Sequence, residues 1–128
     1  MGRDDLINAV IDGDRGRVEL LLAGGAYPNV ADHAGWTPLH FAAQNNDAEI
    51  ATLLLQHGAS VSDRDEHGNT PLFRAAFSYR GMAECVTTLL AAGADPDAAN
   101  DHGVSPRSLA GTIANYDTGR FFRDVPED

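Results

Sequence analysis

Histidine, cysteine and carboxylate side chains are the groups of this chain that could bind a metal ion or take part in catalysis. The sequence has five His residues, one Cys, and 19 Asp and Glu residues among its 128 positions. All nine basic residues are Arg, so reactions that need a Lys side chain, such as Schiff-base chemistry, are excluded. No Gly-x-Ser-x-Gly, His-Glu-x-x-His, Walker or Gly-x-Gly-x-x-Gly motif is present. The sequence therefore predicts no catalytic activity and no cofactor.

The single cysteine, Cys85, cannot form a disulfide within the chain, so nothing favours an oxidising compartment. Cys85 falls within an apolar helical segment, where a buried structural role is expected rather than a reactive thiol. The first residues lack the apolar core of a signal peptide, and no apolar run is long enough to span a membrane. We expect a cytoplasmic protein.

The net charge of -10 restricts the partners that the chain can bind. Sequence-independent binding to nucleic acid requires a Lys/Arg surface that neutralises phosphates, and docking on anionic lipid requires one too. We therefore expect neither nucleic acid nor a membrane surface as partner. The length suits one domain, and the 43% apolar content fits a folded protein.

Two sequence blocks recur along the chain. The first block is GWTPLHFAA at residues 35–43, GNTPLFRAA at 68–76 and a degraded GVSPRSLAG at 103–111. The second is LLLAGGA at 20–26, LLLQHGA at 53–59 and TLLAAGA at 88–94. Both blocks recur with offsets of 33 and then 35 residues, so the third unit holds two extra residues, which we place at Tyr79 and Arg80.

Each unit reads as a helix, a tight turn, a second helix and an extended loop. Thr37 is in the N-cap position of the first helix, and Pro38 follows at the first helical position, where no N–H donor is needed. Gly25, Gly58 and Gly93 follow the Leu-rich helices, where glycine ends a helix in the left-handed conformation. The loops between units are rich in Asp, Asn and Gly, which favour turns.

This period and the Thr-Pro-Leu-His motif resemble the ankyrin repeat. The resemblance covers essentially the whole chain and implies an all-α repeat solenoid with projecting finger loops. We expect one domain, residues 1–128, with four repeats at about 3–34, 35–67, 68–102 and 103–125, the end repeats acting as caps, and an acidic tail at 124–128. The second helix of the last repeat is expected near residues 117–122.

In ankyrin proteins, the histidine of the Thr-Pro-Leu-His motif, which is His40 here, typically bonds the turn backbone. The third unit has Phe73 in its place, so packing is expected there instead. The resemblance also implies that the chain binds another protein through its finger loops and the concave face of its first helices. Trp36 is the residue that we expect to matter most, because aromatic residues are enriched at interface centres; the alternative is that its ring packs over its own finger. The contact positions are His33, Trp36, Gln44, Asn45, Arg64, Glu66, His67, Asn69, Phe77, Asp101 and His102, with the inserted Tyr79 and Arg80 as a second candidate group.

His33, His67 and His102 lie in neighbouring fingers, but packed repeats are about 8–10 Å apart, which is too far for two imidazoles to reach one zinc ion without leaning together. We therefore predict no metal site. His57 lies next to a helix C-terminus, where partial positive charge is favourable.

The finger segments 26–36, 59–69 and 94–104 hold a net charge of -6, because seven acidic residues stand against Arg64 alone. This distribution predicts a partner with a basic or neutral contact face. Separately, we expect the chain to be a monomer. Two alternatives remain open: a structural or regulatory subunit that stabilises an enzyme, and an acidic immunity or inhibitor protein that masks a basic toxin. The exclusive use of Arg indicates a GC-rich, bacterial genome. The acidic finger residues are Asp32, Asp63, Asp65, Glu66, Asp95, Asp97 and Asp101.

Overall fold

The computed structural model describes residues 5–77 and 84–112, which form seven helices and no strand. The predicted all-α repeat solenoid is confirmed. The helices are α1 (Asp5–Ile11), α2 (Arg15–Ala23), α3 (Pro38–Gln44), α4 (Ala48–Gln56), α5 (Pro71–Phe77), α6 (Glu84–Ala91) and α7 (Pro106–Thr112).

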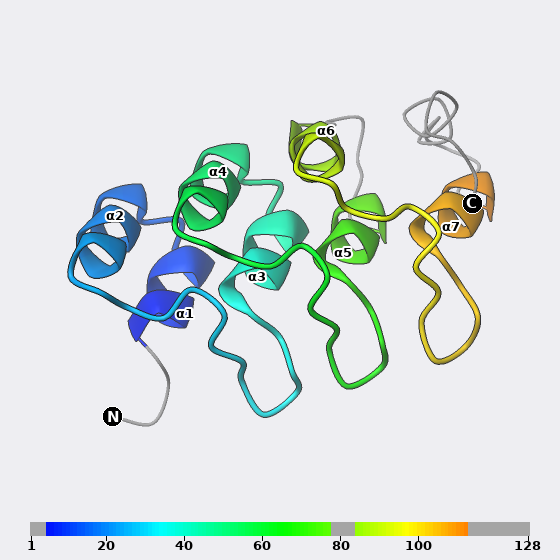
Figure 1. The fold of residues 1–128 in the computed structure, drawn as a ribbon, viewed down its shortest axis with the longest axis horizontal. Helices are drawn as coiled ribbons and strands as arrows, with labels where there is room; N and C mark the ends of the chain where they lie inside the picture. The colour runs from blue at the N-terminus through cyan, green and yellow to red at the C-terminus, as the bar shows by residue number, and fades with distance from the viewer. Residues whose placement is uncertain (1–4, 78–83, 113–128) are drawn as a thin grey trace.

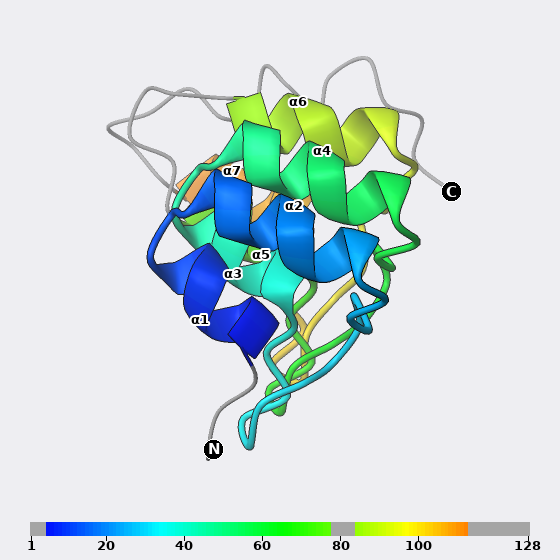
Figure 2. The same ribbon diagram turned by 90° about the vertical axis from the view of Figure 1, so that its left-hand side faces the viewer.

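The helices form two layers with a row of loops along one edge (Figure 1). Helices α1, α3, α5 and α7 make one layer, and α2, α4 and α6 make the other. Long loops project from the first layer at 26–36, 59–69 and 94–104, and they lie nearly in register when the stack is viewed from its end (Figure 2). The loops are the fingers expected from the sequence, and they lie on the side of the molecule away from the second layer.

The first helices begin as the sequence predicts. The Thr37 side chain accepts the N–H of His40, and the His40 ring accepts the N–H of Thr37 at 3.1 Å, which completes a reciprocal capping box. Thr70 Oγ1 accepts the N–H of Phe73 at 3.3 Å. Ser105 Oγ accepts the N–H of Ser108 at 3.1 Å, so the same cap recurs at the start of α7.

Glycines end the second helices with positive φ angles. Gly25, Gly58 and Gly93 have φ values of 95°, 96° and 94°, which confirms the predicted left-handed ends. A Cβ atom built on any of the three would meet nothing within 4 Å. The backbone angle, rather than crowding, therefore favours glycine at these positions.

One apolar core runs through the stack. Leu39 and Leu72 of the first layer are fully buried against Leu54 and Leu89 of the second. Cys85 belongs to this core, as predicted: it is 0% exposed, and burial, with the nearby charges of Asp47 and Glu84, raises the pKa of its thiol to about 12. The thiol is therefore un-ionised at neutral pH and plays a packing role.

Asn46 joins two units in a way that the sequence did not reveal. It has a φ of 51°, in the left-handed region that Asn tolerates better than most residues. Its Oδ1 accepts the N–H of Cys85 at 3.1 Å, and its Nδ2 donates to Glu84 Oε1 at 3.0 Å. A turn residue of the second unit thus caps the start of α6 in the third unit.

The last unit is described only as far as residue 112. Arg107 occupies the position of Leu39 and Leu72, and it forms an ion pair with Asp97 at 2.7 Å instead of entering the core. The expected helix at 117–122, like the expected acidic tail, lies outside the described residues.

Replacing Leu54 with Ala is expected to lower the free energy of unfolding by about 2–5 kcal/mol, since Leu54 is fully buried where α4 packs against its neighbours. Chemical denaturation followed by circular dichroism measures the change. The matched control is Leu20→Ala on α2, a residue that is 75% exposed and whose loss should change stability by no more than about 0.5 kcal/mol. Equal effects of the two substitutions would contradict the assignment of Leu54 to the core.

Candidate partner-binding surface

Each finger tip is closed by one carboxylate or amide side chain at an equivalent position. Asp32, Asp65 and Asn100 each accept two backbone N–H groups of their own finger through Oδ1. A glycine three residues later, Gly35, Gly68 or Gly103, has a φ between 78° and 81°. The bonded pairs are Ala34 and Trp36 on Asp32, His67 and Asn69 on Asp65, and His102 and Val104 on Asn100, at 2.9 to 3.0 Å.

Neighbouring fingers are joined backbone to backbone. The N–H of Glu66 donates to the carbonyl of Ala34 at 2.8 Å, and the N–H of Asp101 donates to the carbonyl of His67 at 2.9 Å. A Cβ atom on Gly35 would come within 3.0 Å of the backbone of the next finger, so glycine is needed here for close approach as well as for its backbone angle. The fingers therefore form one continuous, cross-bonded row.

This geometry changes the interpretation of the acidic fingers. Asp32 and Asp65 use their carboxylates to close turns, and Asp97 is paired with Arg107. Glu66 and Asp101 remain exposed at the fingers. The acidity that faces solvent is therefore smaller than the -6 counted along the finger segments.

His40 is buried and joins the second unit to the third. Its Nδ1 accepts the N–H of Thr37, so Nε2 carries the proton and donates to the carbonyl of Asn69 at 2.8 Å. Burial lowers the pKa of His40, although the bond to Asn69 and the charge of Asp65 act in the opposite direction. The expected turn-bonding role of His40 is therefore seen in the structure, with the neutral ring as the form that fits.

Trp36 packs against side chains from two units. Its ring centroid is 4.8 Å from that of Phe41 and 5.9 Å from that of His40. The guanidinium carbon of Arg74, on α5 of the next unit, lies 4.3 Å from the centroid of the Trp36 ring, within cation–π range. Trp36 is half-buried, so it packs over its own unit and also presents part of its surface to solvent.

Arg74 and Asp65 form the charged pair behind this ring. Arg74 Nη2 is 2.9 Å from Asp65 Oδ2, and the Asp65 side chain is fully buried. Burial alone would raise the pKa of Asp65, but hydrogen bonds from Arg74 and from the backbone of Asn69 and His67 lower it, so the carboxylate is ionised. The sequence did not single out Arg74, because the pair depends on how α5 packs against its own finger.

The structure leaves most of the predicted contact residues on the surface. Glu66, His67, Asp101 and His102 are exposed along the second and third fingers, and Phe77 is 58% exposed at the end of α5. The predicted residues that are exposed are His33, Gln44, Asn45, Arg64, Glu66, His67, Phe77, Asp101 and His102.

Four predicted contact residues need separate comment. Asn69 is only 6% exposed, and its Oδ1 accepts a bond from Asn100 Nδ2 at 2.8 Å, so burial removes it from the contact surface. Arg64 donates from Nη1 to the carbonyls of Gly68 and Ala99, at 3.1 and 2.6 Å, and thereby supports the fingers as well as facing solvent. Tyr79 and Arg80 lie outside the described residues.

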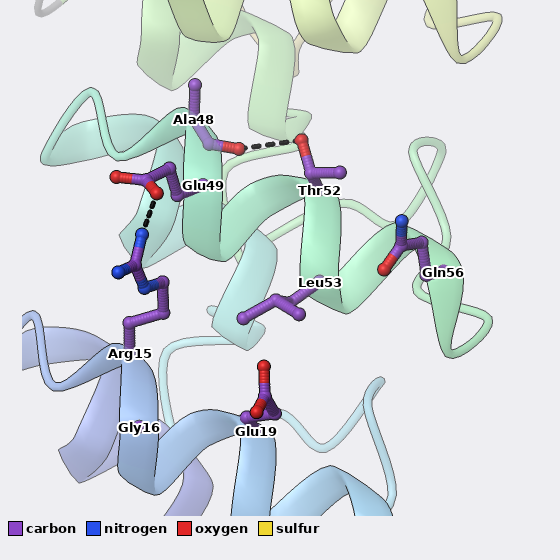
Figure 3. Close-up of a pocket in the computed structure, with 8 residues that line it drawn as sticks. All are labelled: Arg15, Gly16, Glu19, Ala48, Glu49, Thr52, Leu53 and Gln56. Carbon is purple, nitrogen blue, oxygen red and sulfur yellow. Dashed lines mark hydrogen bonds and ion pairs between the residues drawn. The ribbon is translucent and has the colours of Figure 1, made fainter.

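A hollow lies on the other layer, between α2 and α4. It is an open groove of about 690 Å³. Figure 3 shows Arg15 and Glu49 forming an ion pair across one end, with Glu19 and Leu53 extending toward each other from the two helices. Within residues 5–77 and 84–112, no group of three His, Cys, Asp or Glu side chains is arranged to hold a metal ion.

The fold and the finger row define a helical repeat protein of the kind that presents loops and one helix layer as a surface. A family model for ankyrin repeats, in three copies, matches residues 6–100, and the chain belongs to the ankyrin-repeat family. Ankyrin repeats serve generally as protein-interaction modules rather than catalysts. In the part of the chain that is described, no helix has the length and apolar character needed to cross a membrane.

Relatives with curated descriptions share this repeat region. Ankyrin repeat domain-containing protein 37 from Xenopus tropicalis is 31% identical over 110 residues, which cover 86% of this chain and 66% of the frog protein. RelA-associated inhibitor from mouse is 40% identical over 85 residues, 66% of this chain and 10% of that protein. The mouse 2-5A-dependent ribonuclease is 46% identical over 71 residues, 55% of this chain and 10% of that protein.

These matches cover too little of most relatives for the relatives' functions to be assigned to this chain. The chain spans 10% or less of the first relatives that it matches, so their whole-protein activities do not follow for this chain. The named relatives come from eukaryotes, and the bacterial origin inferred from Arg usage stays a prediction.

Stability is expected to fall as the pH drops below about 6.5, the ordinary pKa of His. The folded-state pKa of His40 is lowered, so below that pH the unfolded chain binds more protons than the folded chain, and protonation favours unfolding. Denaturation at several pH values between about 5 and 8 measures this loss. His40→Phe should remove this component of the pH dependence, whereas His33→Gln, at an exposed position, should keep it. An unchanged slope in His40→Phe would contradict the assignment.

Proposed function

We propose that this chain is a protein–protein interaction module that binds its partner through the finger loops and the exposed face of the first helices, without catalysis and without a cofactor. The observation that carries the proposal is the cross-bonded finger row. Because side-chain and backbone bonds fix each tip, exposed residues on successive fingers keep fixed relative positions. A surface that is ordered before binding loses less conformational entropy when the partner docks.

The partner's contact face is basic or neutral. Glu66 and Asp101 are exposed acidic residues at equivalent positions of adjacent fingers, and they favour cationic groups on the partner. The same charge disfavours nucleic acid and anionic membranes. Membership of the ankyrin family, whose repeats serve generally in protein binding, supports a protein partner. We further propose that the chain acts as a monomer in the cytoplasm.

The fate of the partner distinguishes an adaptor from the two alternatives. A tagged chain is used to capture partners from the source cell, and the captured proteins are purified and titrated against the chain. One stoichiometric basic partner that loses activity on binding favours a masking or inhibitor role. An enzyme that gains stability on binding favours a regulatory subunit. An intrinsic hydrolytic activity that a point substitution abolishes would overturn all of these roles.

Trp36→Ala is expected to weaken binding of the captured partner by about tenfold or more, as for a central aromatic anchor. Calorimetry measures the affinity, and circular dichroism checks folding, because the ring also packs on Phe41 and Arg74. The control is Tyr27→Ala, an exposed aromatic residue outside the proposed contact set. Unchanged affinity together with a large loss of stability would show that Trp36 serves packing alone.

The association rate with that partner is expected to fall as ionic strength rises, because salt screens attraction between exposed charges. Stopped-flow mixing across salt concentrations measures the slope. The double substitution Glu66→Gln and Asp101→Asn should flatten it. Glu19→Gln, an exposed acidic residue on α2, should leave it nearly unchanged. A rate that does not respond to ionic strength in the unsubstituted chain would mean that the acidic fingers are solvated turns.

A further inference from the structure

A continuous series of aromatic and Arg side chains crosses from the second unit to the third. Phe41 packs against Trp36 at 4.8 Å, and Trp36 packs against the Arg74 guanidinium at 4.3 Å. Arg74 lies 5.9 Å from the ring of Phe73, which stacks on Phe77 with 6.3 Å between centroids and an interplanar angle of 18°. We call this series the aromatic track.

Some side chains of the track are buried and hold it in place, and others are exposed to solvent. Phe73 is 7% exposed and the Arg74 side chain 16%, so these two form its base. Trp36 and Phe41 are half-buried, and Phe77 is 58% exposed. Arg74 is held by the ionised, buried Asp65, so its position does not depend on a partner. The exposed rings are therefore ordered in advance.

Trp36 also offers an unused hydrogen-bond donor. Its backbone N–H bonds to Asp32, but its indole N–H donates to no atom of residues 5–77 or 84–112. This donor is not among the buried unpaired atoms of the described residues, so water can reach it. A partner that covers it and displaces that water does best by offering an acceptor in its place. A helix meets this need poorly, since its backbone carbonyls are bonded internally, whereas a polyproline II segment has no internal hydrogen bonds and keeps its carbonyls available.

The general spacing of packed helices suits the same conformation. Neighbouring packed helices lie about 8–10 Å apart. A polyproline II helix returns to the same edge every three residues, after about 9 Å. A β-strand presents the same face every two residues, after only about 7 Å, and so falls out of step with the units.

The charges around the aromatic track favour basic residues at the ends of a segment that binds there. Glu66 lies beside the Trp36 finger, because its N–H bonds to the carbonyl of Ala34 at 2.8 Å, and its side chain is exposed. Asp101 occupies the equivalent exposed position of the next finger. Both favour a cationic residue next to the apolar stretch.

We propose that the aromatic track binds a proline-rich segment in the polyproline II conformation, flanked by basic residues, with a backbone carbonyl accepting the indole N–H of Trp36. Aromatic grooves with ordered donors recognise such segments because little conformational entropy is lost on binding. This inference rests on the proposed protein-binding function and names the chemical class of the partner segment.

The probe is a synthetic peptide of about nine prolines followed by two arginines, long enough to span three units of the stack. Trp36 is the only Trp of the chain, so its fluorescence reports binding at the track directly. We expect a saturable change in its emission, and an affinity at least about tenfold higher than for a peptide with Gly and Ser in place of the prolines. Equal responses to the two peptides would overturn the proposal.

Three variants locate the peptide. Phe77→Ala removes an exposed ring and should weaken binding by about fivefold or more. Trp36→Phe keeps a ring but removes the indole N–H and should also weaken binding, measured by anisotropy of a labelled peptide. Leu20→Ala, an exposed apolar residue of α2, should bind as the unsubstituted chain does. Unchanged binding in both Phe77→Ala and Trp36→Phe would overturn the proposal, as would displacement of the peptide by an equally long amphipathic helix at lower concentration.

Failure of the polyproline proposal can be distinguished from failure of the proposed protein-binding function. A partner captured from cells that binds through the fingers, while the proline peptide fails, would leave the interaction role standing and overturn only the polyproline assignment.

Discussion

One buried imidazole links the helix starts to the fingers. His40 accepts a hydrogen bond from Thr37 at the start of α3 and donates one to the carbonyl of Asn69 in the next finger. Both bonds require the neutral ring, and burial favours that form by lowering the pKa of His40. The ring also lies 5.9 Å from that of Trp36, so the position of the finger row and of the exposed aromatic surface depends on the same side chain.

The third unit reaches the same geometry by other means. Phe73 replaces the histidine there and packs against Phe77, as the sequence predicted. The link to the fourth unit comes instead from Asn69, which bonds Asn100, and from Arg64, which donates to the carbonyl of Ala99. The repeat conserves the close approach of adjacent fingers, although the hydrogen bonds that secure it differ between units.

The polar and apolar parts of the proposed surface have different origins. Acidic residues are frequent in the fingers partly because Asp closes turns, and Asp32 and Asp65 are used in that way. Glu66 and Asp101 are not needed for turn closure, so their exposure is available for recognition. The apolar part depends on Arg74, which neutralises buried Asp65 and supports the ring of Trp36 with one guanidinium group. Charge pairing inside the protein thus sets the position of the aromatic surface outside it.

The sequence alone is enough to predict the helix pairs, the Thr and Gly residues at their ends and the burial of Cys85, because these depend on local backbone chemistry and on a 33-residue period. It could not separate Trp36 from Asn69, which share one repeat position. Packing against the next unit leaves Trp36 half-exposed but buries Asn69 against Asn100. Nor did it reveal the pairing of Arg74 with Asp65 or of Asn46 with α6. These contacts arise from packing in three dimensions, because each depends on how one unit is placed against a finger or against the next unit.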